Sequence, residues 1–248
     1  MVRIYKTEPL QGLIDFNEKE KGRLKVEYPT EVKHPEYDDL DTDTASKLRK
    51  QLHEEQKGLC CYCMKKISAS NSNIEHFLPQ SLFPEDQTNY HNLYLACRYS
   101  VGKKKETQYC DIVKGDKLIS KLMGYFNEKK NEECEDFFRY SEIGHILPNN
   151  SRYKTLKDVY KNYANLSSQE KEVMGTIEVL NLNTEELRKE RAKFIEDIVD
   201  STIKSIDDIN KLEQIIKEYK EGKQRFKGIV LYFAKDALQK LKQKTKTN

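Results

Sequence analysis

Residues 59–79 have the sequence LCCYCMKKISASNSNIEHFLP, and this stretch decides which fold we expect. Its first half contains Cys60 and Cys63 in C-x-x-C spacing, a turn that directs two thiolates toward one metal ion. Cys97 and Cys110 follow downstream and complete a set of four. Because four thiolates are a common ligand set for structural zinc, we predict that these cysteines bind one structural Zn²⁺.

The second pair of cysteines departs from the usual spacing. A second C-x-x-C turn would need a cysteine at position 100, where Ser100 stands, and twelve residues instead separate Cys97 from Cys110. We interpret this segment as an inserted basic loop whose ends lie close together. Its lysines are expected to contact nucleic acid; they are Lys103, Lys104 and Lys105.

The remaining cysteines leave alternatives open. Cys61 forms a poorer C-x-C spacing with Cys63, so we assign it to packing and keep it as an alternative ligand. Cys134 lies outside the block and is expected to be a buried thiol. A redox pair of Cys60 with Cys63 is a further alternative, but such pairs usually accompany a βαβ pattern, which is missing here.

Glu75 and His76 lie between the two cysteine pairs and combine a metal ligand with a proton acceptor. Adjacent side chains of an extended strand point to opposite faces, but a local bend brings both to one divalent ion and its water. The carboxylate then binds the metal and the imidazole takes the proton. An isolated Glu-His pair is usually a surface feature, so its position between the cysteine pairs is what gives it weight.

The order of motifs in this block resembles that of HNH endonucleases in their zinc-stabilised form, the ββα-metal nucleases. The family pattern runs C-x-x-C, Asp/Glu-His-x-x-Pro, Asn-Leu-x-x-x-Cys and Cys-Asn-x-x-Lys-Gly. The matching segments here are 60–63, 75–79, 92–97 and 110–115. The resemblance implies a metal-dependent endonuclease that hydrolyses phosphodiester bonds.

The resemblance also implies a role for each matching residue. His76 is the general base that activates water, and Asn92 holds the loop and orients His76. Glu75 and Asp111 bind a divalent cation, Mg²⁺ or Mn²⁺. Asp111 stands where the family usually has Asn or His, and its carboxylate is a good ligand for Mg²⁺. Lys114 is expected to contact a phosphate.

Two histidines and one other function complete the alternatives. His91 directly precedes Asn92 and is kept as an alternative imidazole for the site, whereas His53 is assigned a structural role. The alternative function is a non-catalytic zinc module that binds nucleic acid or protein. It is motivated by the cysteine pairs together with the basic loop and the basic segment at residues 222–248.

Segments outside the block extend the likeness. Residues 48–60 and 176–191 resemble the HNH subunit of Septu-type anti-phage systems, the PtuB-like family. That family implies an effector nuclease of bacterial defence that works with an ATPase partner of the ABC or overcoming-lysogenisation-defect (OLD) type. Some members are retron effectors, so a complex with a retron reverse transcriptase is included among the expected partners. We expect DNA before RNA as the substrate.

Composition excludes several other classes of protein. The 248 residues are 34% charged and 37% hydrophobic, which is polar for a globular protein without forcing disorder. The net charge of +3 hides a basic segment, residues 222–248, with eight Lys or Arg against one Asp. There is no run of 18 apolar residues, and residues 1–16 contain no apolar signal region. We therefore expect no membrane partner and a reducing, cytoplasmic location.

We predict an α+β fold in which a zinc-stabilised ββα-metal HNH module is embedded in a mainly α-helical chain. Residues 1–58 are expected to form an N-terminal arm and helix, and residues 59–118 the nuclease module. Residues 119–248 are expected to form a mainly helical region that binds a partner.

Local signals predict several individual elements. A helix is expected over residues 44–57, with Gly58 as its stop. A second helix is expected over residues 117–126 and a β-hairpin over residues 137–147. Asn183 and Ser205, each followed three residues later by an acid, are predicted to cap helices in the C-terminal region.

Overall fold

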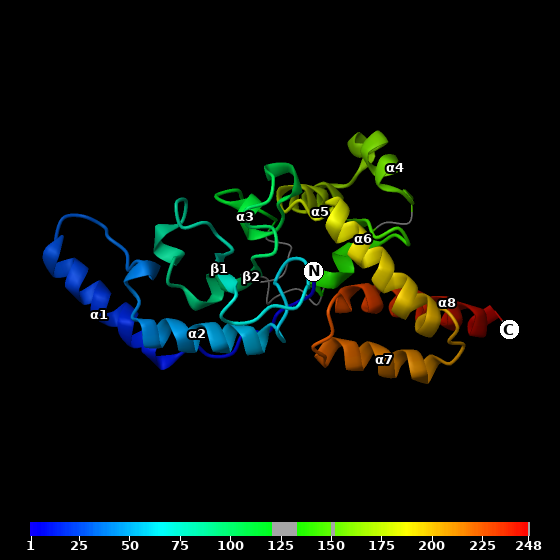
Figure 1. Cartoon of the computed structure of the whole chain (residues 1–248), viewed down its shortest axis with the longest axis horizontal. Helices are drawn as coiled ribbons and strands as arrows, with labels where there is room; N and C mark the ends of the chain where they lie inside the picture. The colour runs from blue at the N-terminus through cyan, green and yellow to red at the C-terminus, as the bar shows by residue number, and fades with distance from the viewer. Residues whose placement is uncertain (121–132, 150–151, 248) are drawn as a thin grey trace.

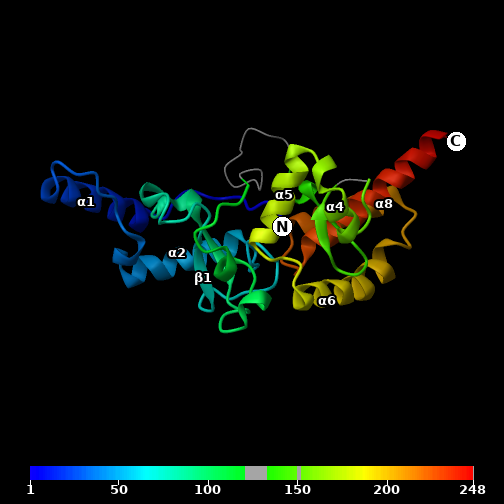
Figure 2. The same ribbon diagram turned by 90° about the horizontal axis from the view of Figure 1, so that it is seen from above.

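The computed structural model describes residues 1–120, 133–149 and 152–247 and shows an elongated α+β molecule (Figure 1). Helix α1 (Gln11–Glu27) lies at one end and helix α8 (Lys227–Thr247) at the other, as the view from above in Figure 2 also shows. Two small sheets lie between them. The predicted α+β class is therefore confirmed.

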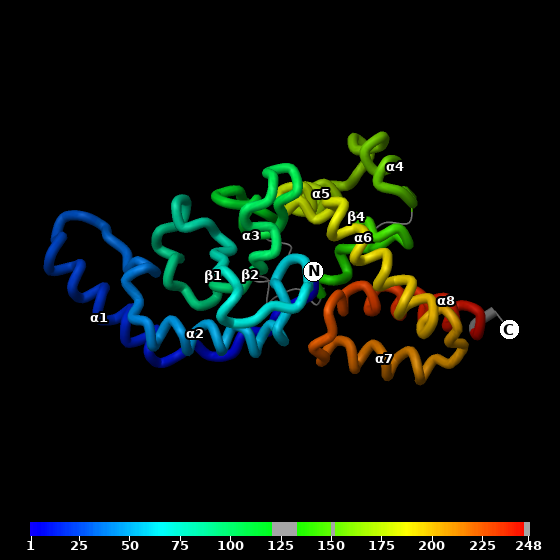
Figure 3. The backbone as a smooth tube through the Cα atoms, in the orientation of Figure 1, coloured from blue at the N-terminus to red at the C-terminus, as the bar shows by residue number. Residues whose placement is uncertain are grey.

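The remaining elements follow in chain order. The helices are α2 (Thr42–Glu55), α3 (Asp111–Lys114), α4 (Leu156–Lys161), α5 (Ser168–Val179), α6 (Glu185–Phe194) and α7 (Ile209–Glu221), and a π-helical segment (Ile195–Ile203) continues α6. The strands are β1 (Ser72–His76), β2 (Leu93–Cys97), β3 (Phe138–Tyr140) and β4 (Ile146–Pro148). The trace in Figure 3 runs from α2 through β1, β2 and α3 to α5 before it reaches α7 and α8.

Local interactions determine where helix α2 begins and ends. The side chain of Asp41 accepts a hydrogen bond from the backbone N–H of Thr44 at 2.9 Å and so caps the helix. Leu48 and Leu52, four residues apart on one face, are fully buried. Past the end of the helix, Gly58 has a φ of +70°, in the region that favours glycine. The helix predicted for this segment is confirmed.

Strands β1 and β2 form an antiparallel pair in which Ser72 lies opposite Cys97. Strand β2 is buried along its whole length because it separates two hydrophobic clusters. Leu93 and Leu95 belong to the cluster that includes α1 and α2, whereas Tyr94 belongs to the larger cluster. The alternation of side chains along the strand thus attaches the hairpin to both parts of the molecule.

The larger hydrophobic cluster joins the cysteine-rich segment to the C-terminal helices. It contains Tyr62 and the cysteines together with Phe138 of β3, Leu187 of α6 and Ile229 of α8. Side chains from both sides of position 118 therefore share one core, and the C-terminal helices support the cysteine-rich segment directly.

Strands β3 and β4 form the hairpin that the sequence predicts. In its turn Gly144 has a φ of +79°, and a Cβ at this position would lie 2.0 Å from the backbone oxygen of Arg188. Only glycine fits where α6 approaches the turn. Arg191 of α6 fixes the contact, since its buried guanidinium donates to the carbonyl of Gly144 at 2.7 Å.

Helices form most of the described C-terminal region, and two of their starts differ from the prediction. Thr184 rather than Asn183 caps α6, and Asp208 rather than Ser205 caps α7. The side chain of Asn183 is engaged elsewhere: it accepts from the backbone N–H of Ile146 and donates to the carbonyl of the same residue. A side chain that bonds a neighbouring strand cannot also cap its own helix.

The helix predicted for residues 117–126 lies mostly outside the described residues, and residues 117–120 are not helical. Among the residues that the structure describes, no helix has both the length and the apolar character needed to cross a lipid bilayer.

Candidate metal centre and active site

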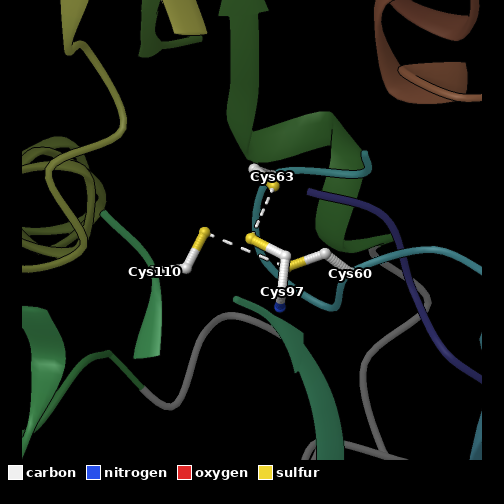
Figure 4. Close-up of side chains that lie close together, drawn as sticks. All are labelled: Cys60, Cys63, Cys97 and Cys110. Atoms are coloured by element: carbon white, nitrogen blue, oxygen red, sulfur yellow. Dashed lines mark hydrogen bonds between the residues drawn. The ribbon is translucent and has the colours of Figure 1, made fainter. Parts of the chain in front are cut away.

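Four cysteine side chains lie close together, with their sulfurs pointing toward one another (Figure 4). The sulfurs of Cys60, Cys63, Cys97 and Cys110 all lie within 4.8 Å of one another, and all four residues are buried. The Sγ atoms of Cys63 and Cys97 are 3.6 Å apart, and those of Cys60 and Cys110 are 3.9 Å apart. Four thiols this close can supply the ligands of one structural metal ion.

A tight turn of the backbone builds the first half of this cluster. The backbone N–H of Cys60 donates to the carbonyl of Lys65 at 2.9 Å, and Met64 takes a φ of +62° within the turn. Cys97 enters from the end of β2 and donates its backbone N–H to the sulfur of Cys60 at 3.3 Å. Cys110 enters from the residue before α3. Residues distant in sequence are thus brought to one point by the hairpin and by α3.

The other two cysteines do not belong to this cluster. Burial raises the pKa of the Cys61 thiol well above its usual value. Burial also raises the pKa of Cys134 to about 12. The sulfurs that converge are those of Cys60, Cys63, Cys97 and Cys110. The geometry favours Cys60 over Cys61 as the ligand.

The loop between the last two cysteines has its ends tied together. The hydroxyl of Ser100 donates to the carbonyl of Tyr109 at 3.1 Å and accepts from the N–H of Tyr109 at 3.0 Å. The predicted closeness of the loop ends is confirmed. All three lysines of the loop are exposed: Lys103, Lys104 and Lys105. Lys103 also pairs with Glu186 of α6 at 2.5 Å.

Glu75 lies on β1 with only 2% of its surface exposed, and two donors bind one of its oxygens. The phenol of Tyr62 donates to Glu75 Oε1 at 2.6 Å, and the ammonium of Lys114 contacts the same atom at 2.8 Å. Lys114 also donates to the carbonyl of His76 at 2.8 Å. Since Lys114 is itself buried and engaged inward, its contact with a phosphate stays a prediction.

Asp111, the first residue of α3, lies beside the same carboxyl group. Its Oδ2 accepts from the side-chain amide of Asn73 at 2.8 Å, and Asn73 shares a face of β1 with Glu75. Burial raises the pKa of Glu75 well above its usual value and the neighbouring carboxyl of Asp111 raises it further, whereas Lys114 opposes both effects. A buried carboxylate beside a second one needs a cation to stay ionised. Two such oxygen donors suit a hard divalent ion.

His76 is half-buried at the end of β1, and its ring is fixed from one side. Its Nε2 lies 2.9 Å from the carbonyl oxygen of Gln87. A carbonyl can only accept, so Nε2 carries the hydrogen and Nδ1 carries the lone pair. Burial lowers the pKa of His76, which keeps the imidazole neutral near pH 7. The ring is therefore prepared to accept a proton at Nδ1.

Asn92 is fully buried and ties together the loop that follows β1. Its Oδ1 accepts from the backbone N–H of Leu78 at 2.7 Å, and its amide donates to the carbonyls of Leu78 and Asp86, each at 3.0 Å. Gln87 follows Asp86 directly in the chain. Asn92 therefore also helps to fix the carbonyl of Gln87, which contacts His76 Nε2. Through these contacts Asn92 joins the two ends of the loop, Leu78 and Asp86.

His91 and His53, the two other histidines considered from the sequence, have different surroundings. His91 is exposed, and its ring lies edge-on to that of Tyr90 with centroids 5.6 Å apart. The Nε2 of His53 lies 3.0 Å from the backbone oxygen of Ile67, which suits a structural role. The geometry favours His76 over His91 as the imidazole of the site.

Two residues of the site were missed in the sequence. Tyr62 lies within the cysteine turn, and its contact with Glu75 has no signal at the level of sequence. Asn73 does have one, because residues two apart on a strand share a face, and Asn73 precedes Glu75 by two positions. Polar residues at that spacing are worth inspecting beside any carboxylate expected to bind a metal.

No protein-family model matches the chain. The chain is similar to a protein of Vibrio cholerae serotype O1 biovar El Tor named "Retron Vc95 putative HNH endonuclease". The two are 28% identical over 155 residues, which is 61% of this chain and 65% of the relative. The match thus spans less than two thirds of the relative's length. Together with the cysteine cluster, this similarity supports an HNH nuclease.

Proposed function

We propose that the protein is a metal-dependent HNH endonuclease that hydrolyses phosphodiester bonds. The observation that carries the proposal is the neighbouring pair of carboxyl groups, Glu75 and Asp111, with His76 directly after Glu75 on β1 and its lone pair on Nδ1. The similarity to the retron relative supports the same class of activity.

Glu75 and Asp111 are the residues that would hold the catalytic ion, which we take to be Mg²⁺ or Mn²⁺. Their fit is supported by the hard oxygen donors that both side chains offer and by the need of the buried Glu75 for a cation. Such an ion supplies Lewis-acid stabilisation of the charge on the phosphate and on the departing 3′ oxygen.

His76 acts as the general base. Its Nδ1 takes a proton from the water that attacks the phosphorus atom, while Nε2 stays bonded to the carbonyl of Gln87. This bond stabilises the imidazolium that forms, because Nε2 remains a donor throughout. Asn92 keeps the carbonyl in place through the loop that it binds.

The four-cysteine cluster is proposed to hold structural zinc. Four thiolates would occupy all the positions that structural zinc usually takes and would leave none for a catalytic water. An ion in this cluster would therefore stabilise the fold and take no part in hydrolysis. The two metals have separate tasks.

Nucleic acid, with DNA expected before RNA, is proposed to be the substrate. The lysines of the loop that joins the last two cysteines are exposed and suited to phosphate contacts; they are Lys103, Lys104 and Lys105. We keep Lys114 as a candidate phosphate contact as well, although its ammonium already binds Glu75.

The proposed setting is anti-phage defence. The name of the relative places that protein with a retron, and the PtuB-like resemblance adds an ATPase partner of the ABC or OLD type. Residues 119–248 are the proposed partner-binding region. A complex with a retron reverse transcriptase is the second assembly that we propose to test.

The test is cleavage of plasmid DNA by the purified chain, alone and with the proteins encoded beside its gene, in the presence of Mg²⁺. We expect His76→Ala to abolish cleavage while zinc content and unfolding temperature stay unchanged. His91→Ala is the matched control, because it removes an exposed imidazole one residue before Asn92, and it should cut like the wild type.

Undiminished cleavage by His76→Ala with intact zinc content overturns the assignment of the base. Tight binding of nucleic acid without cleavage under any of these conditions favours the alternative, a non-catalytic zinc module.

A further inference from the structure

Tyr62 lies inside the cysteine turn, yet its side chain reaches away from the cluster to Glu75. The residue is 1% exposed, and its hydroxyl donates to Glu75 Oε1 at 2.6 Å. A cysteine turn needs only its thiolates to bind an ion. The bond from the phenol to Glu75 is therefore an interaction beyond what the cysteine turn needs.

Lys114 binds the same oxygen from another element. Its ammonium is 2.8 Å from Glu75 Oε1, the atom to which Tyr62 also donates. Two donors on one oxygen fix the rotation of the carboxyl group. Asp111, which neighbours Glu75, is held as well, since the amide of Asn73 donates to its Oδ2.

The backbone around the cysteine turn determines where the phenol lies. Cys61, on one side of Tyr62, donates its backbone N–H to the carbonyl of Leu95 in β2 at 3.1 Å. Cys63, on the other side, belongs to the four-cysteine cluster. Both neighbours of the tyrosine are therefore anchored, one to the strand and one to the cluster.

We propose that Tyr62 is a positioning residue for the catalytic ion: its phenol orients Glu75 so that Oε2 faces a divalent cation shared with Asp111. This inference rests on the proposed function, because it assigns the residue that prepares the proposed catalytic metal site. It also makes the cysteine cluster the support of that site. Hydrogen bonds to ligating carboxylates are general in metal sites, and losing one typically lowers affinity by roughly 10- to 100-fold.

The test compares Mn²⁺ binding to the zinc-loaded full chain by calorimetry and electron paramagnetic resonance. Tyr62→Phe should weaken Mn²⁺ binding by about tenfold or more, with zinc content unchanged. Tyr109→Phe is the matched control. Tyr109 is also fully buried beside a cysteine of the cluster, but its hydroxyl binds Glu186 at 3.0 Å. This control should bind Mn²⁺ like the wild type.

A second readout separates positioning from general damage. In cleavage assays, Tyr62→Phe should need more Mn²⁺ for half-maximal activity but approach the wild-type rate when Mn²⁺ is saturating. If Tyr62→Phe loses zinc, two unnatural amino acids that are close to tyrosine in shape are introduced at position 62 instead. 4-Aminophenylalanine keeps a donor and should bind Mn²⁺ more tightly than 4-fluorophenylalanine, which has none.

The outcomes distinguish this inference from the proposed function. Equal Mn²⁺ affinity in the wild type and in the donor-free variants, with zinc retained, overturns the role of Tyr62 and leaves the nuclease proposal intact. A wild-type chain that binds no Mn²⁺ and cuts no nucleic acid overturns both.

Discussion

The ammonium of Lys114 and the carboxylate of Glu75 form an ion pair at 2.8 Å in which each side chain is only 2% exposed. Burial removes the hydration of both charges, so each depends on the other for compensation. In the proposed nuclease, Lys114 therefore supplies a positive charge beside Glu75 before the divalent ion binds.

Replacing Lys114 by Met should destabilise the metal-free site, because Glu75 loses the cation that opposes the rise of its pKa and must take up a proton or stay charged without a partner. Added Mg²⁺ should recover part of this loss by compensating the same carboxylate. Urea unfolding of the zinc-loaded chain, with and without Mg²⁺, measures both effects.

The control for Lys114→Met is Lys189→Met, which removes a lysine paired with Glu185 where both side chains are at least 70% exposed. Its unfolding midpoint should barely change, because exposed ion pairs contribute little. A similar response of the two variants, or no recovery with Mg²⁺, contradicts the compensating role of Lys114.

The rate of cleavage should fall in acid as His76 becomes protonated, because an imidazolium cannot accept a proton from water. Burial lowers the pKa of His76. The acid limb of kcat/KM should therefore lie below the ordinary histidine pKa of about 6.5. The profiles are recorded at saturating Mg²⁺. An acid limb centred above neutral pH argues against His76 as the base.

Metal content should separate the cysteines into two groups. Cys63→Ser and Cys97→Ser should lose the structural ion and unfold at lower temperature, since metal binding in such sites contributes to the free energy of folding. Cys61→Ser and Cys134→Ser should keep one ion per chain, because both thiols lie outside the cluster. Elemental analysis of the purified variants decides, and loss of the ion from Cys61→Ser would reassign the ligand set.

Local signals in the sequence predicted the elements whose cause is local. The stop at Gly58 follows from a backbone conformation that favours glycine, and the hairpin around Gly144 follows from turn chemistry between apolar runs. The first two cysteines of the cluster were also predictable, because the spacing of Cys60 and Cys63 by itself forms a turn with two convergent thiols.

Features that depend on distant partners could not be predicted in this way. Asn183 has the sequence of a helix cap but bonds the backbone of Ile146 in β4 instead. The ion pair of Lys114 with Glu75, 39 positions earlier in the sequence, also has no local signal, and the phosphate contact predicted for Lys114 stays a prediction. In both cases the side chain contacts a group that only the tertiary fold brings near.

Neutralising the basic loop should weaken nucleic-acid binding and reduce its dependence on salt. Each phosphate contact contributes about 0.9 to the slope of log affinity against log salt for duplex DNA. Replacing Lys104 and Lys105 by Gln should therefore lower the slope by up to about two. Lys103 is left unchanged because it also pairs with Glu186. An unchanged slope in filter-binding or anisotropy titrations argues that the loop faces away from the substrate.

Asn92→Ala should damage cleavage through the loop and not through the metal. The substitution leaves the backbone N–H of Leu78 and the carbonyls of Leu78 and Asp86 without their buried partner, at a cost of about 1–3 kcal/mol for each unsatisfied group. The carbonyl that holds His76 comes directly after this loop segment, so the imidazole loses its orientation.

We expect Asn92→Ala to lower kcat at saturating Mn²⁺ while zinc content and Mn²⁺ affinity stay near wild type. Asn71→Ala, at an exposed position before β1, is the matched control and should leave kcat unchanged. Loss of Mn²⁺ affinity in Asn92→Ala would place Asn92 with the metal ligands instead. Unchanged kcat would show that the bond from His76 to Gln87 is maintained without the Asn92 side chain. The reason is that this buried amide affects the reaction only by orienting the imidazole.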